Sequence, residues 1–119
     1  MKLLPRLNDG VYVYLSVPDT DMVPDGYIFI FREAEGVTVV IEEGAAVKSG
    51  FECRFRSKWI TLGTQTDLSG LGITAAFSKA LSDAGISCNT VAAVWHDHIF
   101  VPAEYAEEAL KILNNLDNN

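Results

Sequence analysis

The first part of the chain alternates apolar and polar residues in three short runs. β-Branched and aromatic side chains recur there between clusters of glycine, proline and aspartate, which is typical of strands separated by turns. The runs lie at residues 11–17, 27–33 and 37–41. Residues 18–26 contain two prolines and three aspartates without helical periodicity, so they predict a surface loop. Three residues separate the second and third runs, which predicts an antiparallel hairpin.

Helical patterns follow these strands. Residues 42–48 carry acidic side chains first and a lysine last, before Ser49 and Gly50, which is the polarity of a short helix. A longer helix is predicted by an apolar stripe at helical spacing that ends at Gly85, with Ser69 as its N-cap. The stripe consists of Ile73, Ala76, Phe77, Ala80, Leu81 and Ala84. A last helix is predicted to start at Pro102.

Extended segments flank the longer helix. Residues 51–62 alternate between an apolar and a basic face, and residues 86–95 are rich in β-branched and small apolar side chains. After the polar turn His96-Asp97-His98, residues 99–101 return antiparallel. The sequence therefore predicts a long strand before the helix and a hairpin after it.

The order of these elements repeats one plan. The first half reads strand, loop, strand, strand, short helix, strand, and the second reads strand, helix, strand, strand, helix. Both are versions of the ferredoxin-like βαββαβ arrangement, in which helices cover one face of an antiparallel sheet. We therefore expect an α+β protein with two such halves, residues 1–58 and 59–119. The first half lacks its opening helix, and the second half lacks its last strand.

Composition excludes several classes of protein. A chain of 119 residues forms one compact unit or two very small ones, which leaves no room for a two-domain enzyme. Its 16 acidic and 9 basic residues give a net charge of -7, which opposes binding to nucleic acid or to an anionic membrane. Cys53 and Cys88 form no C-x-x-C pair, and no signal peptide or membrane-spanning run is evident. We expect a soluble, cytoplasmic protein with reduced thiols.

The segment before the longer helix contains candidate binding chemistry. Gly70 and Gly72 permit positive φ and close approach, and they precede a helix whose first amides have no internal partners. Such a helix start attracts anions, so it could hold an α-carboxylate, while Asp67 and Asn89 could receive the α-ammonium. The alternative interpretation is that both glycines only permit a sharp turn and tight packing.

Four segments resemble the ACT family of small regulatory domains. They are Trp59-Ile60-Thr61-Leu62, Leu71-Gly72-Ile73-Thr74-Ala75-Ala76-Phe77, Ala84-Gly85-Ile86-Ser87-Cys88-Asn89 and His96-Asp97-His98-Ile99-Phe100-Val101-Pro102. More narrowly, the chain resembles short bacterial proteins with two ACT-like halves, which are similar in these segments to the cytosolic arginine sensor of animals. The resemblance implies a non-catalytic module that holds a small effector, most often an amino acid, between two domains.

The resemblance also implies which residues bind that effector. In ACT domains the ligand lies against the loop that joins the first strand to the first helix and against the second strand of a neighbouring domain. On this sequence the implied ligand-binding residues are Asp67, Leu68, Ser69, Gly70, Leu71, Gly72 and Ile73 in the loop, and Cys88, Asn89 and Thr90 in the strand.

Other motifs allow competing interpretations. Residues 70–75 match the G-x-G-x-x-A pattern of dinucleotide sites, but those sites need parallel strands, whereas His96 to His98 predicts an antiparallel return. The same triplet lacks the separated ligands of a zinc site, so we interpret it as a solvated turn. Ser69 lies outside any G-x-S-x-G motif, and neither cysteine has an adjacent histidine. We therefore predict no catalytic residue, no metal and no cofactor.

The basic residues Arg54, Arg56 and Lys58 form a small cluster near two aromatic residues. We expect them to face solvent or to pair with acids such as Glu33, Glu42 and Glu52, and this region is where we expect contact with a second copy of the chain. Two functions remain open. One is a regulatory module that binds an amino acid and forms a homodimer, and the other is an interaction adaptor that keeps the fold without a ligand.

Overall fold

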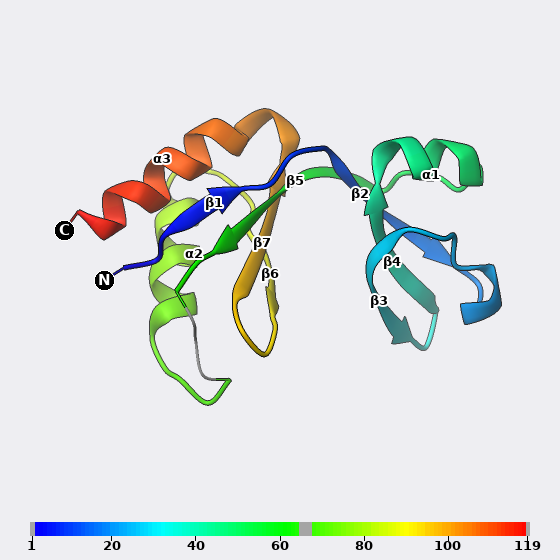
Figure 1. Cartoon of the computed structure of the whole chain (residues 1–119), viewed down its shortest axis with the longest axis horizontal. Helices are drawn as coiled ribbons and strands as arrows, with labels where there is room; N and C mark the ends of the chain where they lie inside the picture. Colours follow the sequence, from blue (N-terminus) through cyan, green and yellow to red (C-terminus); the bar gives the residue numbers. More distant parts are fainter. Residues whose placement is uncertain (1, 65–67, 119) are drawn as a thin grey trace. The chain divides into compact units, whose positions relative to one another are not determined.

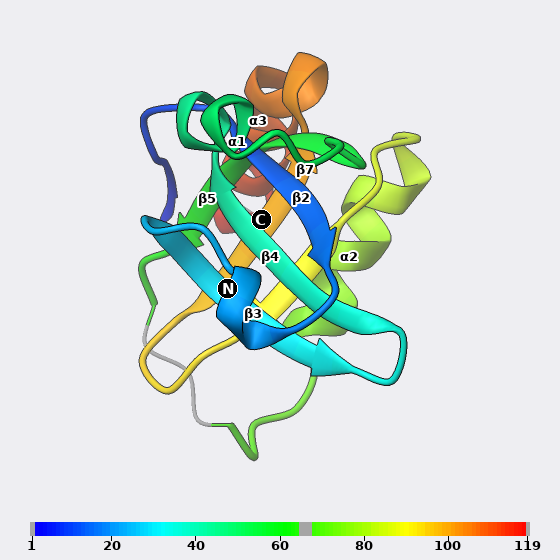
Figure 2. The same cartoon turned by 90° about the vertical axis from the view of Figure 1, so that its right-hand side faces the viewer.

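The computed structural model describes residues 2–64 and 68–118 and divides the chain into two compact units. The N-terminal unit is Gly10–Ser57, and the C-terminal unit is Met1–Asp9 together with Lys58–Asn119. Figures 1 and 2 show the elements of each unit from two perpendicular directions. The predicted α+β class with two ferredoxin-like halves is confirmed.

The N-terminal unit contains a sheet with the strand order β3-β4-β2-β5. Its strands are β2 (Tyr12–Val17), β3 (Tyr27–Glu33), β4 (Gly36–Glu42) and the first residues of β5 (Phe55–Leu62). Neighbouring strands are antiparallel, so that Leu15 lies opposite Val39 and Tyr14 opposite Phe55. Between β2 and β3 the described backbone forms only a 3-10 turn, η1 (Thr20–Met22), so the missing opening helix is confirmed.

The two faces of this sheet differ in character. Helix α1 (Glu43–Ser49) lies beside β2 and β4 (Figure 2), and the core contains buried side chains of all three elements. These are Val13, Leu15, Val17, Val37, Val39, Ile41 and Ala46. On the other face the ring of Tyr14 packs edge-on against Phe55 and Phe29, with ring centroids 5.5 and 6.3 Å away. Burial raises the pKa of Tyr14 to about 12.

The C-terminal unit has the strand order β1-β5-β7-β6 and carries two longer helices (Figure 1). Its elements in chain order are β1 (Pro5–Leu7), the last residues of β5, α2 (Ile73–Asp83), β6 (Asn89–Ala92), β7 (Asp97–Pro102), the 3-10 turn η2 (Ala103–Tyr105) and α3 (Ala106–Asp117). Strands β6 and β7 form the predicted antiparallel hairpin, with Thr90 opposite Ile99.

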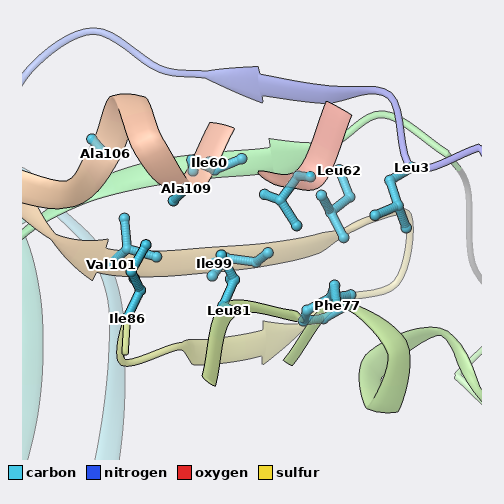
Figure 3. Close-up of a cluster of buried hydrophobic side chains, with 11 residues drawn as sticks. Leu3, Ile60, Leu62, Phe77, Leu81, Ile86, Ile99, Val101, Ala106 and Ala109 are labelled. Atoms are coloured by element: carbon cyan, nitrogen blue, oxygen red, sulfur yellow. The ribbon is translucent and has the colours of Figure 1, made fainter. Parts of the chain in front are cut away.

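Both helices of the C-terminal unit share one core with one face of its sheet (Figure 3). The buried side chains are Leu3, Ile60, Leu62, Phe77, Leu81, Ile86, Ile99, Val101, Ala106, Ala109 and Leu113. Alternate residues of β5 and β7 supply this face because successive strand side chains point to opposite sides. Each large apolar side chain buried here contributes about 1.5–3 kcal/mol to stability. The core therefore holds the start of α2 at a fixed place beside the β6–β7 hairpin.

The second half ends in α3 without a further described strand, as predicted, but a segment from the start of the chain supplies the missing strand, which no sequence pattern indicated. Strand β1 pairs antiparallel with β5, with Pro5 opposite Leu62 and Leu7 opposite Ile60. At the other end of the chain, the Asp117 carboxylate accepts the amide hydrogens of Leu3 and of Leu4, the latter at 2.8 Å. The two ends of the chain consequently lie close together (Figure 1).

Several predicted element boundaries are wrong. The sequence predicts strands over residues 51–62 and 86–95, but β5 begins at Phe55 and β6 covers only Asn89–Ala92, where pairing with β2 and β7 occurs. The last helix was predicted to start at Pro102, but Pro102 ends β7 and α3 begins at Ala106, after the 3-10 turn η2. Helix α2 is capped by Gly72 and not by Ser69. Across residues 2–64 and 68–118, no helix is both long and apolar enough to span a membrane.

Candidate functional site

A hollow of about 190 Å³ lies in the C-terminal unit, where the loop before α2 meets the β6–β7 hairpin. Its lining residues are Leu68, Gly70, Leu71, Gly72, Ile73, Thr74, Ala92 and Asp97. Pockets for drug-sized ligands begin at about 300 Å³, so this hollow suits a smaller metabolite. The core beneath α2 and β7 positions both of its walls.

The first wall is the start of helix α2. Gly72 is the N-cap residue, with φ of +92°, a left-handed conformation that glycine adopts without steric cost. It has no side chain to accept hydrogen bonds from the first-turn amides, which lack partners inside the helix. Apart from its two chain neighbours, no described residue has an atom within 4 Å of where a Cβ of residue 72 would stand. These amides and the positive end of the helix dipole are arranged to receive an anionic group.

The second wall carries a buried carboxylate. Asp97 is the first residue of β7 and shares the core-facing side of that strand with Ile99 and Val101. The residue is only 6% exposed, and among the described residues no buried side-chain oxygen lacks a hydrogen-bond partner. Because Asp97 lines the hollow, its negative charge can attract a cationic group that enters it.

The structure places the ten residues implied by the resemblance in different surroundings. Five of them line the hollow, namely Leu68, Gly70, Leu71, Gly72 and Ile73. Asp67 lies outside the described residues. Ser69 is exposed and is not among the residues that line the hollow.

The three strand residues lie away from the hollow. Asn89 donates from Nδ2 to the carbonyl oxygen of Phe100, and the Cys88 sulfur lies 3.5 Å from the Thr90 hydroxyl. Cys88 also packs against the core beneath α2, and burial raises the pKa of its thiol, which keeps it protonated at neutral pH. In this unit β6 contributes Ala92 to the hollow instead.

Sequence reasoning missed three lining residues: Thr74, Ala92 and Asp97. Asp97 lies in step with the apolar Ile99 and Val101, but its polar neighbours His96 and His98 hid this alternation in the sequence. The interpretation of His96-Asp97-His98 as a solvated turn is wrong for its last two members, which begin β7 and are buried or half-buried. Thr74 and Ala92 left no signal of their own, because only the folded backbone brings them to the hollow.

The two histidines lie on the other face of the β6–β7 hairpin from Asp97. His98 Nδ1 accepts a hydrogen bond from Trp59 Nε1 at 3.0 Å, and the two imidazole rings lie 6.4 Å apart. Among the residues that the structure describes, no three His, Cys, Asp or Glu side chains gather closely enough to hold a metal ion.

Arg56 of the basic cluster forms an ion pair with Glu43, which is not one of the acids predicted as its partners. Arg56 Nε lies 2.6 Å from a carboxylate oxygen of Glu43, and both side chains are exposed. This bond lowers the pKa of Glu43. Solvent screens an exposed pair of this kind, so it serves as a surface contact.

Comparison with known proteins identifies the fold and the family. Family models described as "ACT domain" match residues 1–58 and 54–115. A protein of unknown function from Vibrio cholerae, titled a possible transport protein, is 38% identical over 94% of this chain and 87% of its own, with a TM-score of 0.85. The search of curated proteins found no match.

More distant structures share the fold. A protein from Agrobacterium tumefaciens is 18% identical, with 98% of this chain and 90% of that chain covered and a TM-score of 0.76. The regulatory subunit of aspartate kinase from Thermus flavus is 14% identical, with 93% and 95% covered and a TM-score of 0.66. Because one ACT family model matches residues 1–58 and another matches residues 54–115, this chain belongs to the ACT domain family of regulatory modules.

Proposed function

We propose that this chain is a regulatory module that binds a small, zwitterionic amino acid in the hollow between the start of α2 and the β6–β7 hairpin. Membership of the ACT family supports a regulatory, ligand-binding role. The choice of an amino acid depends on the chemistry of the two walls.

One observation carries the proposal: the same small hollow presents anion-binding and cation-binding groups. The amides that follow Gly72, which has no capping side chain, attract a carboxylate, and the negative charge of Asp97 attracts an ammonium group. Asp97 is the one charged residue among the described residues that line the hollow. An α-amino acid carries both complementary groups within a few bonds, so it can satisfy both walls at once.

The outer rim of the hollow indicates a partner. Leu71 is 95% exposed and Leu68 is 65% exposed, although both are large apolar residues. Exposed apolar side chains next to a binding site are typical of surfaces that become covered on association. We therefore propose that the chain acts as a homodimer in the cytoplasm, with the rim covered by the second copy.

Thermal unfolding with added amino acids tests the proposal. A ligand at about 100 times its dissociation constant should add about 2.7 kcal/mol to the free energy of unfolding. The panel should include, for each active amino acid, the matching amine without a carboxylate and the matching acid without an amine. Stabilisation by the zwitterion and loss of stabilisation with both truncated analogues supports the site. Equal stabilisation by either analogue contradicts it, as does no stabilisation by any amino acid.

A further inference from the structure

The face of the C-terminal sheet opposite α2 and α3 carries a hydrogen-bonded cluster centred on His98. Trp59 of β5 donates its indole N–H to His98 Nδ1 at 3.0 Å and stacks on Phe100, with ring centroids 6.1 Å apart and planes 17° from parallel. His98 and Phe100 are alternate residues of β7, so both side chains emerge on the same side. The indole therefore contacts two residues of the neighbouring strand at once.

The hydrogen bonds determine where the protons of His98 lie. An indole N–H only donates, so Nδ1 must offer its lone pair and any ring proton must sit on Nε2. Thr61 Oγ1 lies 3.2 Å from the same nitrogen and already accepts a hydrogen bond from Asn8 Nδ2 at 2.9 Å. Its own hydroxyl hydrogen is thus available to donate to Nδ1. Two donors then converge on one acceptor, and this arrangement fits only the neutral imidazole.

We propose that His98 is a pH-sensitive switch that accepts the indole hydrogen bond of Trp59 when neutral and loses it when protonated. A proton on Nδ1 would point at the indole N–H, so the two donors would repel each other and the hydrogen bond would be lost. The indole would then keep its other contacts, among them the stack on Phe100, without this bond to His98. The switch lies on the opposite side of β7 from Asp97, and its hydrogen bonds do not involve the proposed ligand.

The surroundings of His98 oppose protonation in the folded chain. Burial is the largest cause that lowers the pKa of His98, and the charges of His96 and of Arg6 in β1 lower it further. The carboxylate of Asp97 acts in the opposite direction and raises it. The neutral form is therefore favoured at physiological pH. Loss of the hydrogen bond from Trp59 requires a more acidic solution than protonation of an unperturbed histidine does.

Nuclear magnetic resonance tests the switch on the full chain. The measurements are the ¹⁵N shifts of the His98 ring and the ¹H–¹⁵N signal of the Trp59 indole, followed from about pH 8 to about pH 5. Trp95→Phe assigns the two indole signals, because the chain contains two tryptophans. His98→Gln supplies a side-chain acceptor that does not titrate in this range, and His96→Gln is the matched control.

The expected result has three parts. In the wild type, His98 is protonated on Nε2 alone at high pH, and the Trp59 indole signal moves with a midpoint below that of a free histidine. His96→Gln keeps the transition and raises its midpoint, because one opposing charge is gone. His98→Gln gives a flat indole signal. A wild-type His98 protonated on Nδ1 at high pH, an indole signal that ignores pH, or an unchanged transition in His98→Gln would each overturn the proposal.

Discussion

At the scale of single residues, Asp97 carries the proposed cation-binding role, because it is the charged residue among the described residues that line the hollow. Asp97→Asn keeps the shape and removes the charge. We expect its ligand-free free energy of unfolding to stay within about 1 kcal/mol of the wild-type value, whereas stabilisation by the amino acid is lost. Urea unfolding with and without ligand measures both effects.

The matched control for this variant is Asp83→Asn. Asp83 lies on α2 in an exposed ion pair with Lys79, away from the residues that line the hollow. Its replacement should leave ligand stabilisation unchanged. Full stabilisation of Asp97→Asn by the amino acid would remove Asp97 from the binding site.

Gly72 gives a second prediction at this scale. The Gly72→Val change places a branched side chain at φ of +92° and in the open space beside the first amides of α2. We expect a backbone cost of about 1–3 kcal/mol and loss of ligand stabilisation. Gly85→Val is the control, because Gly85 also has a positive φ, +77°, and open space but lies at the other end of α2. Equal ligand stabilisation of both variants, seen in thermal unfolding, would contradict the site.

The lowered pKa of His98 predicts the direction of a pH effect on stability. The unfolded chain binds a proton at His98 more readily than the folded chain does, so protons favour unfolding. Between about pH 7.5 and about pH 5.5 the wild type should therefore lose more stability on acidification than His98→Gln does. Urea midpoints at both pH values measure the difference. Parallel losses in the two proteins would show that His98 does not contribute.

At the scale of elements, β1 shows what local patterns do not reveal. Residues 5–7 form a short strand that contains a proline, and their partner β5 lies more than fifty residues away in the sequence. No periodicity can indicate such a pairing. The helix α2 was predictable because Phe77 and Leu81 of its stripe face one core, and so was the β6–β7 hairpin. The N-cap was mispredicted because Gly72 begins the helix without a capping side chain.

The attachment of β1 depends on Asp117 at the end of α3. Its carboxylate accepts hydrogen bonds from the amides of Leu3 and Leu4, and Lys2 Nζ donates to its carbonyl oxygen at 3.0 Å. Asp117→Ala removes both carboxylate bonds and should lower the free energy of unfolding by about 1–3 kcal/mol. In Asp83→Ala, which breaks an exposed ion pair that solvent screens, the loss should be clearly smaller. Similar losses for the two variants in urea would argue against this attachment.

At the scale of the whole molecule, the ACT fold accounts for the two halves, whereas the chemistry of the site depends on a few positions. The glycine loop could be predicted because glycines before an apolar stripe are a local signal. Asp97 was placed in a turn because its neighbours are polar, and only the pairing of β6 with β7 showed that it faces inward. The same pairing of β6 with β7 brings Ala92 to the hollow. The sequence predicts this pairing, but it does not show which residues line the hollow.

The proposed dimer gives a prediction at this scale. Leu71→Asp puts a charge on the almost fully exposed rim residue, so it should weaken association without loss of a buried contact in the single chain. Val47→Asp is the control, because Val47 is 75% exposed but lies on α1 in the other unit. Sedimentation should show dimers for the wild type and Val47→Asp, and monomers for Leu71→Asp. A monomeric wild type would contradict the dimer.

We propose that one hollow of the C-terminal unit binds both ends of an amino acid. The most direct measurement follows the backbone amide signals of the ¹⁵N-labelled chain during titration with the amino acid that stabilises it most. We predict saturable shifts at Gly72, Ile73 and Thr74 in the wild type and none of them in Asp97→Asn. Saturable shifts confined to another surface, such as the groove beside Ser78 and Cys88, or equal shifts in both proteins would contradict the claim.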